Sequence, residues 1–360
     1  MSYKIGDTIG KYTVTRDFDS ANGGQCQWGF GKYGGQEYFI KKFLSPVYPG
    51  SEAPGSEKGK QKRRNQCEKF EKKQSAIINA LSDCGNGGLV VSTVECFKHG
   101  DEKGKHYFKV SQKVDTSSLS EKVHTLDAKD RLFVMLTAAG AVKILHKAGI
   151  IHLDLKPDNI LIQEYKSKLI AKVIDFDSSI LEGESTEAET LVGDAVYYSP
   201  EFAKHIETKG ETAVPTKKSD IFSLGLIFCR YWTGSLPHFP DRYNYAHEAV
   251  LSGGRLTPNI HTKVSEGEVV DLSKKTRLSG TLMKSPLVKA ACENSVEMGI
   301  QKLIQQMLSP DVKVRPSISE VHENLKSLYH HGRLLTSKKS SKKDTSRPKT
   351  KLTISKSLKS

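Results

Sequence analysis

The sequence predicts an α+β fold with two lobes, a small β-rich N-terminal lobe and a larger, mainly α-helical C-terminal lobe. Its 360 residues are 37% hydrophobic and 27% charged, which suits a globular protein with two lobes around a cleft. Short β-branched and aromatic runs, separated by turn residues, fill the N-terminal part. Amphipathic helical patterns follow from residue 127, and a polar loop between two apolar runs interrupts them at residues 150–162.

Three short strands open the predicted small lobe. They are rich in β-branched and aromatic residues and cover residues 11–18, 26–32 and 37–43. Their order and the short turns between them predict an antiparallel sheet. The first turn carries Asn22, Gly23 and Gly24, where backbone amides can approach a phosphate group without side-chain obstruction.

A helix and two further strands complete this lobe, which spans about residues 10–111. Residues 44–62 are rich in Pro, Gly, Ser and Lys and predict a flexible loop. A helical pattern follows over residues 63–81, and residues 89–94 and 106–110 predict two more strands. A hinge between the lobes is expected at about residues 112–116.

The larger lobe spans about residues 117–330. Its predicted elements are a helix over residues 127–149, a strand over residues 169–177, and closing helices over residues 297–308 and 318–328. Gly149 ends the first helix, as glycine commonly does. Residues 257–286 show no clear period, and two interpretations stay open: an irregular packed connection, or a docking insert for a substrate or partner.

The polar loop within residues 150–162 carries an acid, a base and an amide at fixed spacing. Asp154, Lys156 and Asn159 stand between apolar segments that can hold them in one cleft. Phosphoryl transfer needs this set: a carboxylate for the acceptor hydroxyl's proton, an ammonium near the moving phosphoryl group, and an amide oxygen for a metal ion. A surface turn with ordinary polar residues is the alternative.

Residues 152–159 resemble the catalytic loop of eukaryotic-type (Hanks-type) serine/threonine protein kinases, H-R-D-L-K-P-x-N, with Leu153 in place of arginine. The resemblance implies that Asp154 is the catalytic base, that Lys156 contacts the γ-phosphate of ATP, and that Asn159 binds Mg²⁺ or Mn²⁺. A lysine two residues after the aspartate is typical of the serine/threonine enzymes. The fold that this resemblance implies is the bilobal protein-kinase-like fold.

The N-terminal strands resemble the nucleotide-binding part of the same family. Residues 38–43 are similar to the V-A-I-K strand, which implies that Lys41 contacts the α- and β-phosphates. Gly24 then stands at the third glycine of G-x-G-x-x-G, whereas Asp19 and Ala21 replace the first two. Ser111 would guard the rear of the adenine pocket. The ATP-binding residues that the resemblance implies are Asn22, Gly23, Gly24, Cys26, Lys41, Gln112 and Val114.

Residues 175–177, Asp-Phe-Asp, resemble the D-F-G motif and imply that Asp175 is a Mg²⁺ ligand. Asp177 replaces the glycine, and two interpretations stay open: a second carboxylate that alters the preference for divalent ions, or a tolerated variant that points at solvent. Aspartate tolerates left-handed backbone angles better than most residues. The resemblance also implies that a glutamate of the helix over residues 63–81 pairs with Lys41; Glu68 and Glu71 share one helical face, and Glu71 is favoured.

Three residues of the larger lobe match structural positions of the family. Residues 193–201 resemble the end of the activation segment, and residues 219–225 resemble D-x-W-S-x-G. The resemblance implies that Glu201 forms an ion pair with Arg315, and that Asp220 anchors the catalytic loop from a buried helix.

Leu153 leads to a prediction about regulation. The family's arginine at this position usually receives the phosphate of an activated loop through charge-assisted hydrogen bonds, which leucine cannot form. Asp194 replaces a threonine that the family often carries in the same segment. A kinase of this non-RD type is expected to be active without phosphorylation of residues 178–192.

The net charge of +14 is concentrated at the C-terminus. Residues 331–360 hold ten Lys or Arg and one acid, a net charge of +9 that leaves +5 for residues 1–330. This Ser/Lys-rich tail is expected to be disordered. A solvated tail without function is one interpretation. The others are contact with nucleic acid or anionic lipid, a localisation signal, and a substrate for autophosphorylation.

The remaining composition predicts a cytoplasmic protein. No apolar run reaches ~18 residues, which predicts that no membrane span exists, and the first residues lack the apolar core of a signal peptide. The six cysteines form no C-x-x-C pair and are interpreted as reduced thiols. A secreted effector that is delivered into another cell is the alternative.

The predicted function is ATP-dependent transfer of the γ-phosphate to serine or threonine hydroxyls of proteins, with autophosphorylation, by a kinase domain over residues 10–330. Two alternatives remain. A pseudokinase scaffold that binds nucleotide is suggested by Asp19, Ala21, Leu153 and Asp177. A small-molecule phosphotransferase shares the spacing of aspartate and asparagine, but is not expected to carry Lys156 together with the activation-segment residues.

Overall fold

The computed structural model describes residues 3–20, 26–82, 88–115, 119–184, 193–212, 214–260 and 286–335; for residues 286–294 it describes the backbone alone. Several expectations fall outside these ranges. They concern Asn22, Gly23 and Gly24 of the first turn, most of residues 178–192 and 257–286, and the basic tail after residue 335.

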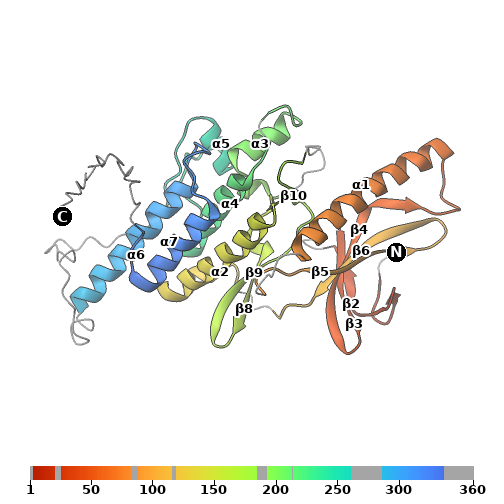
Figure 1. Ribbon diagram of the computed structural model, residues 1–360, viewed down its shortest axis with the longest axis horizontal. Helices are drawn as coiled ribbons and strands as arrows, with labels where there is room; N and C mark the ends of the chain where they lie inside the picture. Colours follow the sequence, from red (N-terminus) through yellow and green to blue (C-terminus); the bar gives the residue numbers. More distant parts are fainter. Residues whose placement is uncertain are drawn as a thin grey trace, which may run out of the picture.

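The small lobe is a six-stranded antiparallel sheet in the order β1-β2-β3-β4-β6-β5, with one long helix, α1 (Glu57–Ser82), across one side (Figure 1). The strands are β1 (Thr8–Ile9), β2 (Tyr12–Asp19), β3 (Cys26–Tyr33), β4 (Gln36–Pro49), β5 (Thr93–Gly100) and β6 (Gly104–Gln112). The three N-terminal strands therefore form as predicted, because their β-branched and aromatic residues suit a half-buried sheet.

The two faces of this sheet bury different residues, as the two-residue period of a strand requires. On one face Ile40 of β4 and Phe108 of β6 pack with Tyr12 and Val14 of β2. The other face turns Phe43 and Tyr107 toward Cys67 of α1. The opposite face from Ile40 therefore carries Lys41, next to it in sequence, on the side of helix α1.

The prediction of a flexible loop over residues 44–62 is wrong. Strand β4 continues to Pro49, because Val47 and Tyr48 pair with β6 after a shift in register. Helix α1 begins at Glu57, six residues before the expected start, because its first two turns are rich in Lys, Gln and Arg, which favour helix. The strand expected over residues 89–94 begins only at Thr93, since Val90 instead bridges to Val173 of the larger lobe.

The larger lobe is mainly helical and packs around α2 (Ala128–Lys147) and α4 (Lys217–Thr233) (Figure 1). Asp127 caps the start of α2 by accepting a hydrogen bond from the backbone N–H of Asp130, and Gly149 follows its end with a φ of +75°. The other helices are η1 (Val123–Thr125), η2 (Pro157–Asn159), η4 (Ala195–Tyr197), α3 (Pro200–Glu207), α5 (Ala246–Leu251), α6 (Pro286–Met307) and α7 (Ile318–His331).

Two small antiparallel pairs stand on this helical base. Strand β8 (Ile160–Tyr165) pairs with β9 (Lys168–Val173), and β7 (Ile150–Ile151) pairs with β10 (Ile180–Leu181). Together they hold the two ends of the polar loop at residues 152–159. In the part of the chain that the structure describes, no helix is long and apolar enough to cross a membrane.

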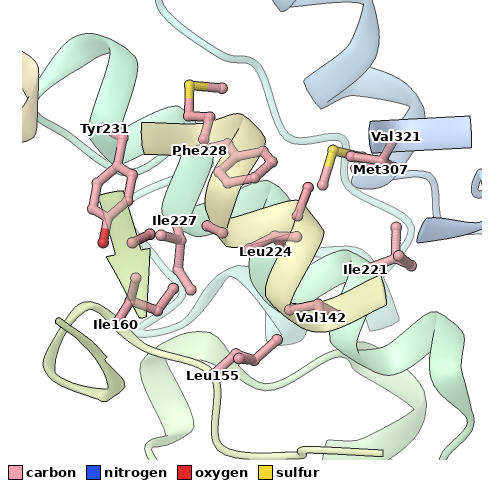
Figure 2. Packing of buried hydrophobic residues seen from close by; sticks show 14 of the residues in the cluster. Val142, Leu155, Ile160, Ile221, Leu224, Ile227, Phe228, Tyr231, Met307 and Val321 are labelled. Carbon is pink, nitrogen blue, oxygen red and sulfur yellow. The ribbon is translucent and has the colours of Figure 1, made fainter. Parts of the chain in front are cut away.

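The main hydrophobic core packs against the polar loop and fixes its position. Leu155 and Ile160 are buried beside Ile227 of α4 and Val142 of α2 (Figure 2). Each fully buried aliphatic side chain of this size contributes about 1.5–3 kcal/mol by leaving water. The loop's apolar residues therefore fix its backbone, while its polar residues are left to face the opposite side.

Candidate active site

Asp220 of α4 anchors the polar loop from inside the core. The side chain of Asp220 is fully buried. Its Oδ2 accepts a hydrogen bond from the His152 N–H at 2.9 Å and lies 2.8 Å from Nε2 of His146, and its Oδ1 accepts from the Leu153 N–H at 2.9 Å. Two consecutive backbone amides are thus held by one carboxylate, which fixes the direction in which the loop leaves β7.

His152 links the loop to the segment that carries Asp175. Its Nε2 lies 3.0 Å from the carbonyl oxygen of Ile174, and its ring packs edge-on against Phe176 at 5.4 Å. Leu153 and Asp175 both have left-handed backbone angles, with φ of 63° and 64°. A left-handed angle costs a residue with a side chain roughly 1–2 kcal/mol, so the surrounding contacts must stabilise both residues.

Asp154 is held by groups on both sides of its carboxylate. Asn159 Nδ2 donates to Asp154 Oδ2 at 2.9 Å, and the Asp194 N–H donates to Oδ1 at 3.1 Å. Lys156 Nζ lies 3.7 Å from Oδ2. Burial raises the pKa of the Asp154 carboxyl above its ordinary value, although the Lys156 ammonium opposes this. A fixed carboxylate with a raised pKa suits a proton acceptor.

Asp175 and Asn159 form a donor set that suits a hard cation. The Ile174 N–H donates to the backbone carbonyl of Asn159 at 3.0 Å, which ties the two segments together. Because Nδ2 of Asn159 is occupied by Asp154, its remaining side-chain atom, Oδ1, is left as a ligand. One carboxylate and one amide oxygen are what Mg²⁺ commonly takes from a protein when phosphates and water supply the other ligands. The residues present therefore fit the ion.

Lys41 lies at the meeting point of two aspartates. Its Nζ lies 2.8 and 3.0 Å from the two carboxylate oxygens of Asp175, and 2.6 Å from Oδ2 of Asp177. Burial lowers the pKa of Lys41, but Asp177 and Asp175 outweigh it and hold the pKa above its ordinary value. The ion pairs of Lys41 with Asp175 and Asp177 thus join strand β4 to the segment after β9, which is far from β4 in sequence.

The predicted pairing of Glu71 with Lys41 is wrong. Glu71 Oε1 instead accepts hydrogen bonds from the Tyr107 hydroxyl at 2.5 Å and from Lys98 Nζ at 3.0 Å. The reason is the direction in which this turn of α1 faces: Glu71 stands over strands β5 and β6. Gln74, one turn further along, is the buried polar residue of the helix.

Asp177 does not point at solvent, so one of its two interpretations is wrong. Its side chain is 18% exposed, and its Oδ1 lies 2.6 Å from Lys109 Nζ while Oδ2 faces Lys41. Burial by itself raises the pKa of Asp177, but the ammonium groups of Lys109 and Lys41 hold it well below its ordinary value. The left-handed backbone angle of this motif lies at Asp175 and not at Asp177.

The other nucleotide-binding candidates do not share one face of the sheet: Cys26 lies on the face of Lys41, whereas Gln112 lies on the face of Val110 and Phe108. Cys26 is buried at the start of β3, and burial raises the pKa of its thiol to about 11. Gln112 ends β6 and is exposed, Val114 is half-buried just after it, and Ser111 is the register partner of Phe39. Phe39 occupies the alanine position of V-A-I-K, so the face near Cys26 and Lys41 is more aromatic than the motif implies.

Glu201 and Arg315 form a buried ion pair. Arg315 Nη1 lies 2.7 Å from Glu201 Oε1, and the side chains are 0% and 10% exposed for arginine and glutamate respectively. Ser219 donates to the same oxygen at 2.9 Å. Burial raises the pKa of Glu201, but Arg315 and Ser219 outweigh it, and the pKa lies below its ordinary value. The pair ties α3 to the segment before α7.

Leu153 belongs to a small apolar cluster whose other members come from β7 and from the chain on either side of residues 185–192. It is 4% exposed and packs with Ile151, Ile180 and Phe202, and Tyr198 covers the cluster. Ile180 lies on β10 and Phe202 on α3. The position where the family carries arginine is therefore filled by hydrophobic contacts that join the loop to both sides of residues 185–192.

Sequence reasoning missed Lys109. Its signal was a single lysine inside the apolar strand segment Tyr107–Val110, at a position whose side chain had to face the same side as Tyr107. It also missed that Lys73 of α1 lies close to this site. Burial lowers the pKa of Lys73, and Asp177 opposes that effect.

A comparison with known families matches residues 58–325 to the model described as "Protein kinase domain". The matched span contains the polar loop, Asp175, Glu201, Asp220 and Arg315, and begins after Lys41. About three quarters of the chain is covered.

Individual proteins give weaker but concordant similarity. The chain is 33% identical over 181 residues to "Ovarian-specific serine/threonine-protein kinase Lok" of Drosophila melanogaster, covering 50% of this chain and 31% of that protein. It is 25% identical over 229 residues to "Probable serine/threonine-protein kinase PknB" of Lactococcus lactis, covering 61% and 35%. It is 28% identical over 171 residues to "MAP kinase-interacting serine/threonine-protein kinase 2" of Xenopus laevis, covering 44% and 35%. These matches span about a third of each relative's length.

Proposed function

Because this chain belongs to the protein kinase domain family, we propose that it transfers the γ-phosphate of ATP to serine or threonine hydroxyls of proteins. The observation that carries the proposal is the position of the Asp154 carboxylate, which accepts hydrogen bonds from the Asn159 side chain and from the Asp194 backbone N–H. The similar proteins are named serine/threonine-protein kinases, which supports the choice of acceptor. Lys156, two residues after Asp154, supports the same choice.

Asp154 acts as the base in this proposal. A serine or threonine hydroxyl placed against its carboxylate gives up its proton as the oxygen attacks the γ-phosphorus, and the bond from that phosphorus to the β-phosphate oxygen breaks. Such a positioned base commonly contributes about 10²–10⁴-fold to the rate. Lys156 Nζ lies 3.7 Å from Asp154, which is close enough for its ammonium group to stabilise negative charge on the transferred phosphoryl group.

Lys41, Asp175 and Asn159 hold the nucleotide in this proposal. Lys41 binds the α- and β-phosphates. Asp175 and Asn159 hold Mg²⁺, which neutralises charge on the phosphate oxygens when bound. Cys26, Gln112 and Val114, with the turn that carries Asn22, Gly23 and Gly24, complete the ATP-binding set.

Activity is proposed to be independent of phosphorylation of residues 178–192. A phosphate on that segment would find no arginine at position 153. The apolar contacts of Leu153 with Ile180 and Phe202 support the segment's two sides without added charge. Autophosphorylation, for which the serines and threonines of the tail are candidates, would then serve another purpose than switching the enzyme on.

A nucleotide-binding scaffold is the second candidate, and one observation favours it. Both carboxylate oxygens of Asp175 bond to Lys41. Metal binding must therefore compete with an ammonium group for the same oxygens. The proposal of activity requires that Lys41 turn from Asp175 toward the phosphates when Mg²⁺ and ATP enter together.

The site of action is proposed to be the cytoplasm or a similarly reducing compartment. Cys26, Cys67, Cys96 and Cys229 are free thiols among the described cysteines. The basic tail is proposed to contact anionic partners.

Incubation with γ-labelled ATP, Mg²⁺ and a generic basic protein tests the function. We expect label on serine and threonine of the added protein, and a loss of at least ~100-fold in kcat for Asp154→Asn. Asp158→Asn is the matched control, since Asp158 is an exposed carboxylate of the same loop. ATP binding without label transfer would support the scaffold. Label on a sugar or antibiotic alone would support a small-molecule phosphotransferase.

A further inference from the structure

Two lysines face each other across neighbouring strands of the small lobe. Lys41 of β4 and Lys109 of β6 are direct register partners. Both lie on the face turned toward α1, because Ile40 and Phe108 occupy the other face. Like charges directly opposite each other in an antiparallel pair are destabilising. Both side chains are largely buried, at 15% and 10% exposure, so solvent screens the repulsion little.

Asp177 is the carboxylate that bridges these two lysines. Its Oδ2 lies 2.6 Å from Lys41 Nζ, and its Oδ1 lies 2.6 Å from Lys109 Nζ. Oδ1 accepts a hydrogen bond from Lys109, whereas Oδ2 forms an ion pair with Lys41 that lacks hydrogen-bond geometry. The carboxylate comes from the segment after β9 and not from the sheet or helix, so it joins the two lobes at the lysine that the proposed function places on phosphate.

Helix α1 offers no carboxylate at this place among the contacts that the structure describes. Glu71 is bonded to Tyr107 and Lys98. The helix residue that interacts electrostatically with Asp177 is Lys73, a cation. The helix thus brings a further positive charge to the site, where the family resemblance called for a negative one.

We propose that Asp177, held in place by Lys109, is the positioning residue for Lys41, in the role that a glutamate of α1 was expected to take. The inference deepens the proposed function and rests on it. Asp175 also contacts Lys41, but it is the metal ligand of the proposed function. When nucleotide binds, Asp175 is committed to the cation, and Asp177 is the carboxylate that remains to hold Lys41.

This arrangement makes the position of Lys41 depend on the segment at residues 175–177 and not on the rotation of α1. The residue that binds metal and the residue that positions the lysine are two apart in one short segment. A displacement of that segment removes both from the site together. A displacement of α1 alone leaves the bridge between Lys41 and Asp177 intact.

The first experiment measures the contact without any catalysis. Urea unfolding of full-length wild type, Lys41→Met, Asp177→Asn and the double variant forms a double-mutant cycle, and a second cycle replaces Asp177→Asn with Glu71→Gln. We expect coupling between Lys41 and Asp177 of at least about tenfold in the unfolding constant, equivalent to about 1.4 kcal/mol, and coupling between Lys41 and Glu71 below about threefold. Larger coupling with Glu71 than with Asp177 would overturn the proposal. This result stands whether or not the protein transfers phosphate.

The second experiment measures kcat and the KM for ATP separately. We expect Asp177→Asn to lower kcat about 100-fold, as a misplaced catalytic group does, without raising KM, because Lys41 remains free to attract phosphate. Glu71→Gln should change kcat less than about threefold, like the matched variant Glu68→Gln on the same helix. A kcat for Asp177→Asn within threefold of wild type, or a fall as large for Glu71→Gln, would refute the assignment.

One variant guards against simple unfolding. Asp177→Asn leaves two buried ammonium groups opposed, so it can lose stability as well as activity. The double variant Lys109→Met with Asp177→Asn removes that repulsion. We expect it to unfold at a higher urea concentration than Asp177→Asn and to keep the low kcat. A double variant that regains wild-type kcat would mean that Asp177 serves stability alone, and would reject its positioning role.

Discussion

Replacing Arg315 with methionine is expected to destabilise the folded chain by about 3–5 kcal/mol, because it leaves the buried Glu201 without its cation. Arg315 also donates from Nε to the Ser309 carbonyl at 2.8 Å and from Nη1 to the Lys218 carbonyl at 3.1 Å. Methionine fills similar volume but makes neither bond. For a folded unit of about 300 residues, this loss corresponds to a fall of roughly 5–8 °C in Tm.

A surface pair supplies the matched control. Lys217 Nζ lies 2.7 Å from Glu182 Oε2, the same separation as in the buried pair, but the side chains are 30% and 56% exposed. Exposed pairs contribute about 0–1 kcal/mol. Lys217→Met should therefore lower Tm by no more than about 2 °C. The two variants remove one cation each from pairs of equal length, so the difference between them measures burial together with the two carbonyl hydrogen bonds that Arg315 makes.

The stability that the Arg315–Glu201 pair contributes depends on pH in a definite direction. In the wild type the pKa of Glu201 lies below its ordinary value, so the stability from this group is fully present above about pH 4.3 and is lost as pH falls through the lowered value. In Arg315→Met, we expect burial to outweigh the remaining hydrogen bonds from Ser219 and the backbone, so that the pKa of Glu201 rises above its unfolded value. Acid then relieves the variant by protonating the buried carboxylate. The gap in Tm between wild type and variant should narrow from pH 7 to about pH 4.5.

Thermal and urea unfolding at both pH values test this reasoning, with activity measured at pH 7. The pair is also incompletely satisfied: Glu201 Oε2 and Arg315 Nη2 are buried without a hydrogen-bond partner in the described structure. Replacing both residues, as Glu201→Leu with Arg315→Met, should therefore recover most of the lost stability. Equal shifts for Arg315→Met and Lys217→Met, or a gap that widens in acid, would refute the argument.

Three further predictions follow from the same site. Leu153→Ala should lower the free energy of unfolding in urea by about 2–5 kcal/mol, because it opens the apolar cluster. Leu153→Gly should be more stable than the alanine variant by about 1 kcal/mol, because the backbone at this position is left-handed. The reverse order of stability would contradict this. Phosphatase treatment should leave kcat within about twofold, whereas a large loss would show that a phosphate holds residues 178–192. Ser111 is small, so N6-benzyl-ATP should be used better by the wild type than by Ser111→Phe; equal use would place the adenine pocket elsewhere.

The larger lobe could be predicted well because its motifs are local strings with a single geometric solution. Asp154, Lys156 and Asn159 lie within six residues of one another, and an apolar residue on each side fixes the loop that carries them. Asp220 and Arg315 lie far from the loop in sequence. Asp220 lies in the first turn of α4, and Arg315 lies in the segment between α6 and α7; their partners were implied by the resemblance to the kinase motifs and not by a local pattern.

The contacts of Lys41 could not be predicted because they depend on which way each turn of α1 faces. A helix turns about 100° per residue, so Glu71 and Lys73 point in different directions, and the sequence does not state where the helix begins. The expected start at residue 63 was six residues late. Register was decisive for Lys109 as well. That it stands opposite Lys41, and not one residue to either side, is settled by the pairing of β4 with β6.

The departures from the family pattern at this site are related changes and not independent losses. Asp177 was first grouped with the features that suggest a scaffold. Its carboxylate instead neutralises Lys41 and Lys109, while the helix supplies Lys73 to the same place. If so, restoring the family's glycine should harm the protein. Glycine is not required by the backbone, since the left-handed angle lies at Asp175, and it adds roughly 0.5–1 kcal/mol of chain entropy to be lost on folding. Asp177→Gly should therefore lower both Tm and kcat, although it completes the D-F-G string. An Asp177→Gly protein with higher kcat than wild type would show that Asp177 is an impairment and that Lys41 finds its support elsewhere.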